Sequence, residues 1–141
     1  MNFQRVDWSL ILEATLDTLV MTGWSLLFTV IIGLPLGIYL FLCSERQLLA
    51  NKPVYQLLSL VVNVLRSVPF LILLIILIPF TRFVMGTALG VPGSIPPLVV
   101  GAAPFFARLV ENVLRELDPG ISEACKAMGA TPRQTVFYAL L

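Results

Sequence analysis

The stretch Thr18–Ser44, TLVMTGWSLLFTVIIGLPLGIYLFLCS, is 27 residues long and contains no Asp, Glu, Lys or Arg. A second run without charged residues covers Phe83–Ala107 and is 25 residues long. An α-helix needs about 20 mostly apolar residues to cross the hydrocarbon layer of a bilayer, which is ~30 Å thick. Each run is therefore long enough to form a membrane-spanning helix.

The composition of the whole chain agrees with this pattern. Of the 141 residues, 58% are hydrophobic and 12% are charged, and the mean hydropathy is +0.95. Soluble domains average about 45–50% apolar and about 25% charged residues. A soluble core of this chain length could not bury so much apolar surface. The sequence therefore predicts an all-α membrane protein.

The sequence also lacks the residues on which several function classes depend. A net charge of +1 gives no basic surface for nucleic acid. Histidine, the commonest general base and metal ligand, is absent, and Cys43 and Cys125 form no CxxC motif. No GxxxxGK(S/T) phosphate-binding loop is present, so we do not expect this chain to bind ATP itself. We expect no metal, no cofactor and no enzymatic activity in this chain.

Three membrane-spanning helices are predicted from the spacing of charges and turn residues. They cover residues 18–42, 54–80 and 95–114, and they follow an extracytoplasmic N-terminal segment of residues 1–17. In the first span, Gly33 and Gly37 are four residues apart and share one helical face. We expect this face to pack closely on another helix of the same subunit, and Pro35 to bend the span.

The second predicted span contains a charge near its middle. Inserting Arg66 there would cost about 2.5–3.5 kcal/mol. Either its side chain faces the bundle interior or an aqueous cavity, or it extends along a slanted helix to the cytoplasmic surface. Pro69 is expected to kink the helix because it removes a backbone donor. If the second span lines an aqueous passage, the polar residues closest to this passage are Asn63, Arg66 and Asn112. Each of them is equally suited to holding helices together.

The third predicted span begins near residue 95, with Pro96 and Pro97 in its first turn. Near its other end, Glu111 is three residues from Arg108 and four from Arg115. Side chains at these spacings are neighbours on a helix, so we expect both arginines to pair with Glu111.

The orientation follows from the distribution of lysine and arginine between the two sides of the predicted spans. One side holds Arg5 and Arg82, and the other holds Arg46, Lys52, Arg108, Arg115, Lys126 and Arg133. Cytoplasmic segments carry the excess of Lys and Arg. We therefore place the N-terminus outside and the residues after the third span in the cytoplasm.

Residues 118–141 have the signals of two short helices joined by a tight bend. Asp118 and Pro119 suit the first positions of a helix, and Gly129 suits the left-handed residue that ends it. Thr131 can then cap a second helix. An apolar stripe on the first helix is formed by Ile121, Ala124, Cys125 and Met128. We expect this stripe to rest on lipid or to dock into another protein.

The triplet Glu123-Ala124-Cys125, with Gly129 four residues beyond it, resembles the "EAA" loop of ABC-importer permeases. In that family the loop forms two short helices that enter a groove on the ATPase subunit. The resemblance implies that Glu123 is the polar anchor, and that Ala124, Gly129 and Ala130 permit close approach. Cys125 and Ala139 depart from the family pattern, as small changes within a packing face.

Further segments resemble the permease of bacterial methionine importers, from about Leu16 onward. They are Arg66–Phe70, Ile78–Arg82, Val100–Phe105, Ala107–Arg108 and Val110–Asn112. This resemblance implies the N-terminal part of a type I ABC permease fold in the cytoplasmic (inner) membrane. The implied partners are a second permease copy, cytoplasmic ABC ATPases, an extracytoplasmic substrate-binding protein and membrane lipid. In the family, a proline and at least two more spans follow the pair matched by Leu140–Leu141, so we expect a truncated permease.

Two other functions remain open from the sequence. The first is a permease for another small solute, because such permeases often leave the choice of cargo to the binding protein. The second is a small membrane scaffold or pore protein whose apolar bend lies on the lipid surface. Co-purification with an ATPase subunit would separate a permease from a scaffold.

Overall fold

The computed structural model describes residues 7–44, 51–117 and 119–135. Within these ranges the secondary structure is helical. The helices are α1 (Trp8–Cys43), α2 (Lys52–Ser67), α3 (Phe70–Met85), α4 (Gly90–Glu116), α5 (Pro119–Ala127) and α6 (Pro132–Thr135). The predicted all-α fold is confirmed for the described part of the chain.

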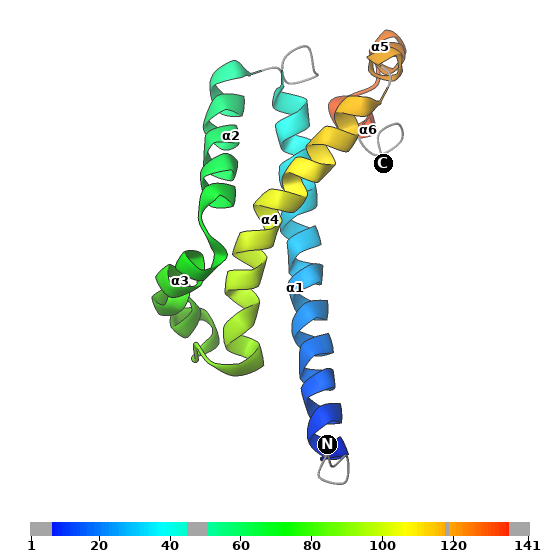
Figure 1. The fold of residues 1–141 in the computed structure, drawn as a ribbon. Helices are drawn as coiled ribbons and strands as arrows, with labels where there is room; N and C mark the ends of the chain where they lie inside the picture. The colour runs from blue at the N-terminus through cyan, green and yellow to red at the C-terminus, as the bar shows by residue number, and fades with distance from the viewer. Residues whose placement is uncertain (1–6, 45–50, 118, 136–141) are drawn as a thin grey trace.

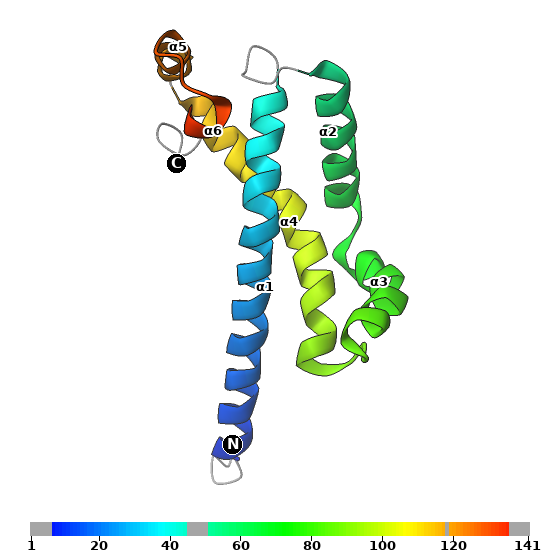
Figure 2. The same cartoon turned by 180° about the vertical axis from the view of Figure 1, so that it is seen from behind.

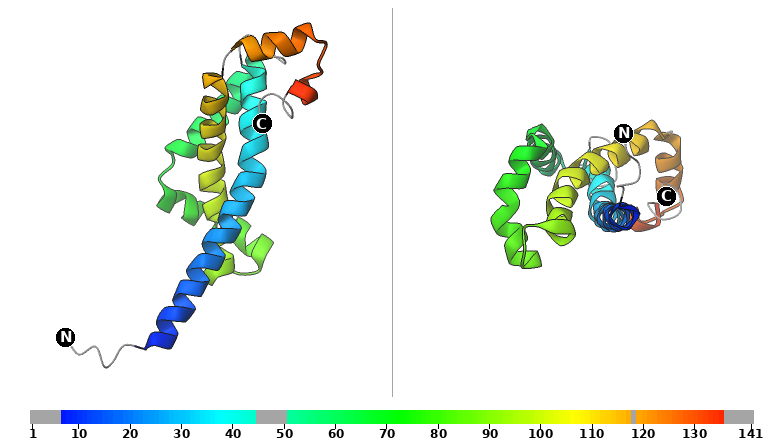
Figure 3. Two further views of the ribbon diagram at one scale, coloured as in Figure 1. Left: turned by 90° about the vertical axis from the view of Figure 1, so that its right-hand side faces the viewer. Right: turned by 60° about the horizontal axis from the view of Figure 1, so that its bottom comes forward.

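Helix α4 lies in the middle of the molecule and contacts each of the three helices that precede it. It crosses α1 at an angle (Figures 1 and 2), α3 lies on the side of α4 away from α1, and α2 lies beside both α1 and α4. Helices α5 and α6 lie at the end of the molecule opposite the start of α1 (Figure 3, left). α4 therefore connects the helical body to the α5–α6 segment.

Helix α1 is longer than the span predicted from the sequence. It begins at Trp8, inside the stretch 1–17 that was expected to be a separate segment. Glu13 and Asp17 mark the edge of an apolar run, but neither residue breaks a helix. Thr15 and Thr18 donate hydrogen bonds to the carbonyls four residues earlier, at 2.7 Å each. The helix therefore extends beyond the predicted span, and the limits of the membrane crossing at residues 18–42 stay a prediction.

Close packing of α1 against α4 depends on two glycines. A Cβ atom at Gly33 would lie 2.9 Å from Cδ1 of Phe106. At Gly37 it would lie 2.5 Å from the carbonyl oxygen of Ala107 and 2.7 Å from Cβ of Val110. All three distances are shorter than van der Waals contact allows. The prediction that Gly33 and Gly37 serve packing within one subunit is therefore confirmed.

Two small clusters of buried side chains continue this contact toward the end of α1. In one, Phe41 and Leu42 pack with Leu114. In the other, Leu40 packs with Ala107 and with Val62 of α2. These clusters bring the second half of α1, helix α2 and the second half of α4 together.

The predicted second span is divided into two helices. α2 ends at Ser67, α3 begins at Phe70, and the two helices are bent by 107° at the break. Val68, the residue before Pro69, has φ −73° and ψ 124°, the extended conformation that a following proline favours. At ~1.5 Å per residue each helix is about 24 Å long, shorter than the hydrocarbon layer. The structure thus corrects the expected kinked helix over residues 54–80.

α3 packs against α4 after the break. A methyl group at Gly101 of α4 would lie 3.4 Å from side-chain carbons of Phe70 and Leu73. α3 ends at Gly86, which has φ +74° and donates its amide to the carbonyl of Arg82 at 2.9 Å. This left-handed conformation, which glycine adopts without a steric penalty, turns the chain back toward α4.

α4 also begins earlier than predicted, at Gly90, so Pro96 and Pro97 lie beyond its first turn. In the described residues, α1 and α4 are long and apolar enough to cross a membrane. The bent α2–α3 pair passes the same test only when it is taken together, which would make three crossings. Much of the apolar surface is exposed, as at Leu19 and Leu71, which are 63% and 71% exposed. Such a surface fits lipid better than water.

The glycine contact gives a direct test of the fold. We expect Gly37→Ala to separate α1 from α4 and to destabilise the protein by about 1–3 kcal/mol, the usual cost of overpacking. The measurement is thermal unfolding in detergent. Gly23→Ala is the matched control, because a Cβ there has nothing within 4 Å. It should leave stability unchanged or raise it slightly. Equal effects of both substitutions would contradict the packing described.

Candidate functional site

A polar pocket lies between α2 and α4, with a volume of about 410 Å³. Its lining residues are Tyr55, Ser59, Asn63, Arg66, Phe105, Arg108, Leu109 and Asn112. The three candidate pathway residues, Asn63, Arg66 and Asn112, are thus brought to one place although 49 positions separate the first from the last. All three are exposed in the described structure.

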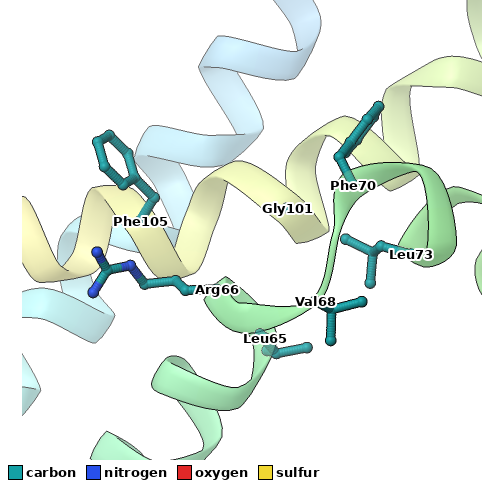
Figure 4. A pocket seen from close by; sticks show the side chains of 7 residues that line it. All are labelled: Leu65, Arg66, Val68, Phe70, Leu73, Gly101 and Phe105. Carbon is teal, nitrogen blue, oxygen red and sulfur yellow. The ribbon is translucent and has the colours of Figure 1, made fainter.

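A second pocket, of about 370 Å³, adjoins the first and shares Arg66 and Phe105 with it. Its other lining residues are apolar: Leu65, Val68, Phe70, Leu73 and Gly101. Figure 4 shows Arg66 extended toward Phe105 from the end of α2. The central carbon of its guanidinium lies 5.8 Å from the centre of the Phe105 ring, within range of a cation–π interaction. The polar pocket and the apolar pocket therefore adjoin each other at the guanidinium group of Arg66.

The break between α2 and α3 places these groups. Because α2 stops at Ser67, Arg66 lies in its last turn, where a cation is favoured by the helix dipole. Because α3 turns away by 107°, Phe70 and Leu73 line the apolar pocket. Within the described residues, Arg66 makes no ion pair with a carboxylate. A cation in this position can attract an anionic group.

A buried carboxylate holds the other end of α2 against α4. Glu111 is 1% exposed and accepts hydrogen bonds from two arginines on its own helix. Arg108 donates Nη1–H to Glu111 Oε2 at 2.5 Å. Arg115 donates to Glu111 Oε1 from Nη2 at 2.8 Å and from Nε at 3.1 Å. Both predicted ion pairs are confirmed.

Helix α2 completes this cluster with three polar side chains. Tyr55 donates its hydroxyl to Glu111 Oε1 at 3.0 Å and accepts a hydrogen bond from Arg115 Nη2 at 3.0 Å. Arg108 Nη2 donates to Asn63 Oδ1 at 3.1 Å, and to the carbonyl oxygen of Ser59 at 3.2 Å and to its hydroxyl. We call these residues, Tyr55, Ser59, Asn63, Arg108, Glu111 and Arg115, the Glu111 cluster.

Two members of this cluster, Tyr55 and Ser59, were not predicted from the sequence. The spacing of charges predicted only the pairs of Glu111 with its neighbours along the helix. A signal was present, because Tyr55, Ser59 and Asn63 recur every four residues and so share one face of α2. The burial of Glu111 could not be read from the sequence, since it depends on how α2 packs against α4.

The segment that resembles a coupling loop forms two short helices. Gly129 has φ +75°, the left-handed conformation predicted for it. Ala130 donates its amide to the carbonyl of Cys125 at 3.0 Å, which closes the end of α5. Thr131 and Gln134 then cap α6 reciprocally, with Thr131 N donating to Gln134 Oε1 at 2.9 Å and Gln134 N to Thr131 Oγ1 at 3.4 Å.

The candidate coupling residues lie at the surface of this segment. Glu123, Ala124 and Gly129 are exposed, and Cys125 and Ala130 are half-buried. Met128, from the predicted apolar stripe, is 78% exposed. The predicted cap Asp118, the side chains of Ile121, Lys126 and Arg133, and residues 136–141 lie outside the described part of the chain. The described part of the stripe is thus open to a partner.

The fold and the pockets together define an α-helical membrane protein with a polar pocket between its helices. The chain belongs to the family of binding-protein-dependent transport system inner membrane components, whose model matches residues 30–141.

Named relatives and solved structures give the same result. The chain is 48% identical to the D-methionine transport system permease protein MetI of Escherichia coli (strain K12), over 94% of this chain and 61% of that protein. It is 50% identical to the methionine import system permease protein MetP of Bacillus subtilis (strain 168), over 99% of this chain and 63% of that protein. It therefore spans about three fifths of the length of these relatives.

A chain from a solved structure of the MetNI methionine ABC transporter, in inward-facing conformations, matches with a TM-score of 0.93. The identity is 48%, and the match covers 95% of this chain and 62% of that one. The arrangement of the helices described above is therefore the arrangement found in an ABC transporter.

The buried carboxylate makes a testable contribution to stability. Glu111→Gln should destabilise the protein by about 3–5 kcal/mol, because it leaves the guanidinium of Arg108, which is 13% exposed, without its counter-ion. The measurement is thermal unfolding in detergent. The control is Glu116→Gln, which removes an exposed carboxylate from the same helix. An unfolding temperature for Glu111→Gln that matches the control would show that the cluster does not hold α2 against α4.

Proposed function

We propose that the chain is part of the transmembrane permease subunit of an ATP-driven importer for an amino acid, methionine. The observation that carries the proposal is the exposed α5–α6 segment with its Gly129 turn, which directly follows a helix long enough to cross a membrane. Relatives of about 50% identity are named as methionine permeases, which supports the choice of cargo.

In this proposal the α5–α6 segment docks on a cytoplasmic ATPase, which binds ATP in place of this chain. Glu123 would anchor to a basic group in the groove of the ATPase, and Ala124, Cys125, Gly129 and Ala130 would allow close approach. The exposure of Glu123, Ala124 and Gly129 supports this role, because a docking residue must be open to its partner. Closure of the ATPases would move the segment as a lever and rock the spans between two orientations.

The cargo would pass the two adjoining pockets at Arg66. Asn63, Arg66 and Asn112 would line the polar part of the passage. The supporting observation is the pairing of a polar pocket with an apolar one around a single cation. A zwitterionic amino acid with an apolar side chain has groups suited to each pocket, since its carboxylate attracts a guanidinium.

The proposed topology has three crossings in the inner membrane, formed by α1, the bent α2–α3 pair and α4. The N-terminus would lie outside and α5–α6 in the cytoplasm, as the distribution of Lys and Arg suggests. A second permease copy, an extracytoplasmic substrate-binding protein and membrane lipid are the further proposed partners. The name of the family and the MetNI neighbour support these assignments.

The lever role of the α5–α6 segment is tested at Gly129. Gly129→Val should uncouple ATP hydrolysis from methionine uptake in the assembled transporter, because a β-branched residue at φ +75° is strained by about 1–3 kcal/mol and displaces the turn. Gly129→Asn is the matched control, since asparagine tolerates the left-handed conformation. Uptake of labelled methionine and ATPase activity are measured together. Normal uptake and ATPase activity in Gly129→Val would refute the lever.

The pathway role of Arg66 is tested by Arg66→Ala. A charge-assisted hydrogen bond is worth about 1.5–3 kcal/mol, so its loss should raise the KM for methionine uptake roughly tenfold or more. Arg66→Lys, which keeps the charge, should retain part of the uptake. Arg82→Ala removes a cation that lines neither pocket and should leave uptake unchanged. An unchanged KM for Arg66→Ala would place the cargo elsewhere.

A further inference from the structure

The Glu111 cluster lies on the route between the α5–α6 segment and the candidate passage. Its arginines and carboxylate occupy the end of α4, and α5 follows after Leu117 and residue 118. Its other members lie along one face of α2, whose last turn carries Arg66. A displacement of α5 that reaches α4 therefore reaches the cluster, four of whose six residues also line the polar pocket.

The cluster resists separation of the two helices. Glu111 is 1% exposed and Arg108 13% exposed, and their ion pair lies within α4. Pulling α2 from α4 would therefore keep this pair but remove the hydrogen bonds that Tyr55, Ser59 and Asn63 make to the charged groups. Such groups are costly to leave unpaired in a low-dielectric interior. The hydrogen bonds of Tyr55, Ser59 and Asn63 to the α4 groups are also directional, so they oppose sliding as well as separation.

The chain beyond α2 is built differently. At Val68 and Pro69 the helical hydrogen bonding stops, and α3 leaves at 107°. Two short helices joined at such a break can change their angle without breaking a continuous helix. Arg66 lies on the α2 side of the break, whereas Phe70 and Leu73 of the apolar pocket lie on the α3 side.

We propose that the Glu111 cluster is a positioning element that makes α2 follow α4, so that displacement of the α5–α6 segment moves Arg66 relative to the α3 wall of the apolar pocket. The break at Val68–Pro69 is the pivot of this movement. The inference rests on the proposed function for the origin of the displacement. It adds that Glu111, which lines neither pocket, and the two α2 residues bonded to the α4 groups, Tyr55 and Ser59, which line the polar pocket, determine whether the displacement reaches Arg66.

The test uses the full permease assembled with its ATPase, with Cys43 and Cys125 replaced by serine. Spin labels are attached at Leu57→Cys on α2 and Met128→Cys after α5, two positions that are 65% and 78% exposed. The distance between the labels is measured by pulsed electron paramagnetic resonance, without nucleotide and with ATP trapped. If α2 follows α4, the wild-type cluster keeps this distance the same in both states.

The informative variant is Tyr55→Phe/Ser59→Ala, because it removes two hydroxyls of α2 and leaves Glu111 with both arginines. The matched control is Tyr39→Phe/Ser67→Ala, which removes one tyrosine hydroxyl and one serine hydroxyl outside the cluster. The Ser67 hydroxyl donates to the carbonyl of Asn63 within α2, at 2.8 Å. We expect the cluster variant to broaden the distance distribution with ATP trapped. We also expect it to raise the ATP hydrolysed per methionine imported by roughly two- to tenfold, the factor that losing one or two hydrogen bonds implies.

Assembly with the ATPase should stay normal in both variants, which a purely structural role of the cluster would not allow. A wild-type distance that changes with ATP overturns the inference, as does a cluster variant identical to the control in both readouts. If the expected distances are found but methionine is not imported, the proposed cargo is wrong and the positioning role stands. If neither ATPase assembly nor movement is found, both proposals fail.

Discussion

The contact of α1 with α4 through Gly33 and Gly37 is the constraint on which the other features depend. In a bilayer, apolar side chains gain little by leaving lipid for one another, so helices associate through close packing and polar contacts. The two glycines let the backbones approach within a distance that any Cβ atom would prevent. This contact sets the position of α4, and α4 in turn positions the pockets, the Glu111 cluster and the start of α5.

The two sides of α4 use different physical means. Its contact with α1 combines small residues with apolar clusters around Leu40 and Phe41. Its contact with the first half of α2 is polar and centred on Glu111, whereas its contact with α3 is again apolar. The hydrogen bonds between the α2 residues and the charged groups of α4 are directional, so they fix one arrangement of the two helices. Such a fixed arrangement of α2 and α4 is required if a movement of the α5–α6 segment is to reach Arg66.

Several features could be predicted from the sequence because each depends on a local rule. Charge-free runs indicated the helices α1 and α4, the spacing of Gly33 and Gly37 indicated a packing face, and Gly129 marked the end of α5. Other features depend on tertiary contacts. Pro69 indicated a kink in the second span, but the angle between α2 and α3 depends on how Phe70 and Leu73 pack against Gly101. The start of α1 was missed because charges that limit a membrane span do not limit a helix.

The central claim is that the α5–α6 segment docks on an ATPase, and site-specific photo-cross-linking tests it most directly. A benzophenone amino acid is placed at position 128, which is 78% exposed, or at position 19 on α1, which is 63% exposed. After illumination of intact membranes, the adducts are identified by mass spectrometry. Position 128 is predicted to capture an ABC ATPase subunit, whereas position 19 should capture lipid. Lipid adducts alone from position 128 would contradict the account and favour a segment that lies on the membrane surface.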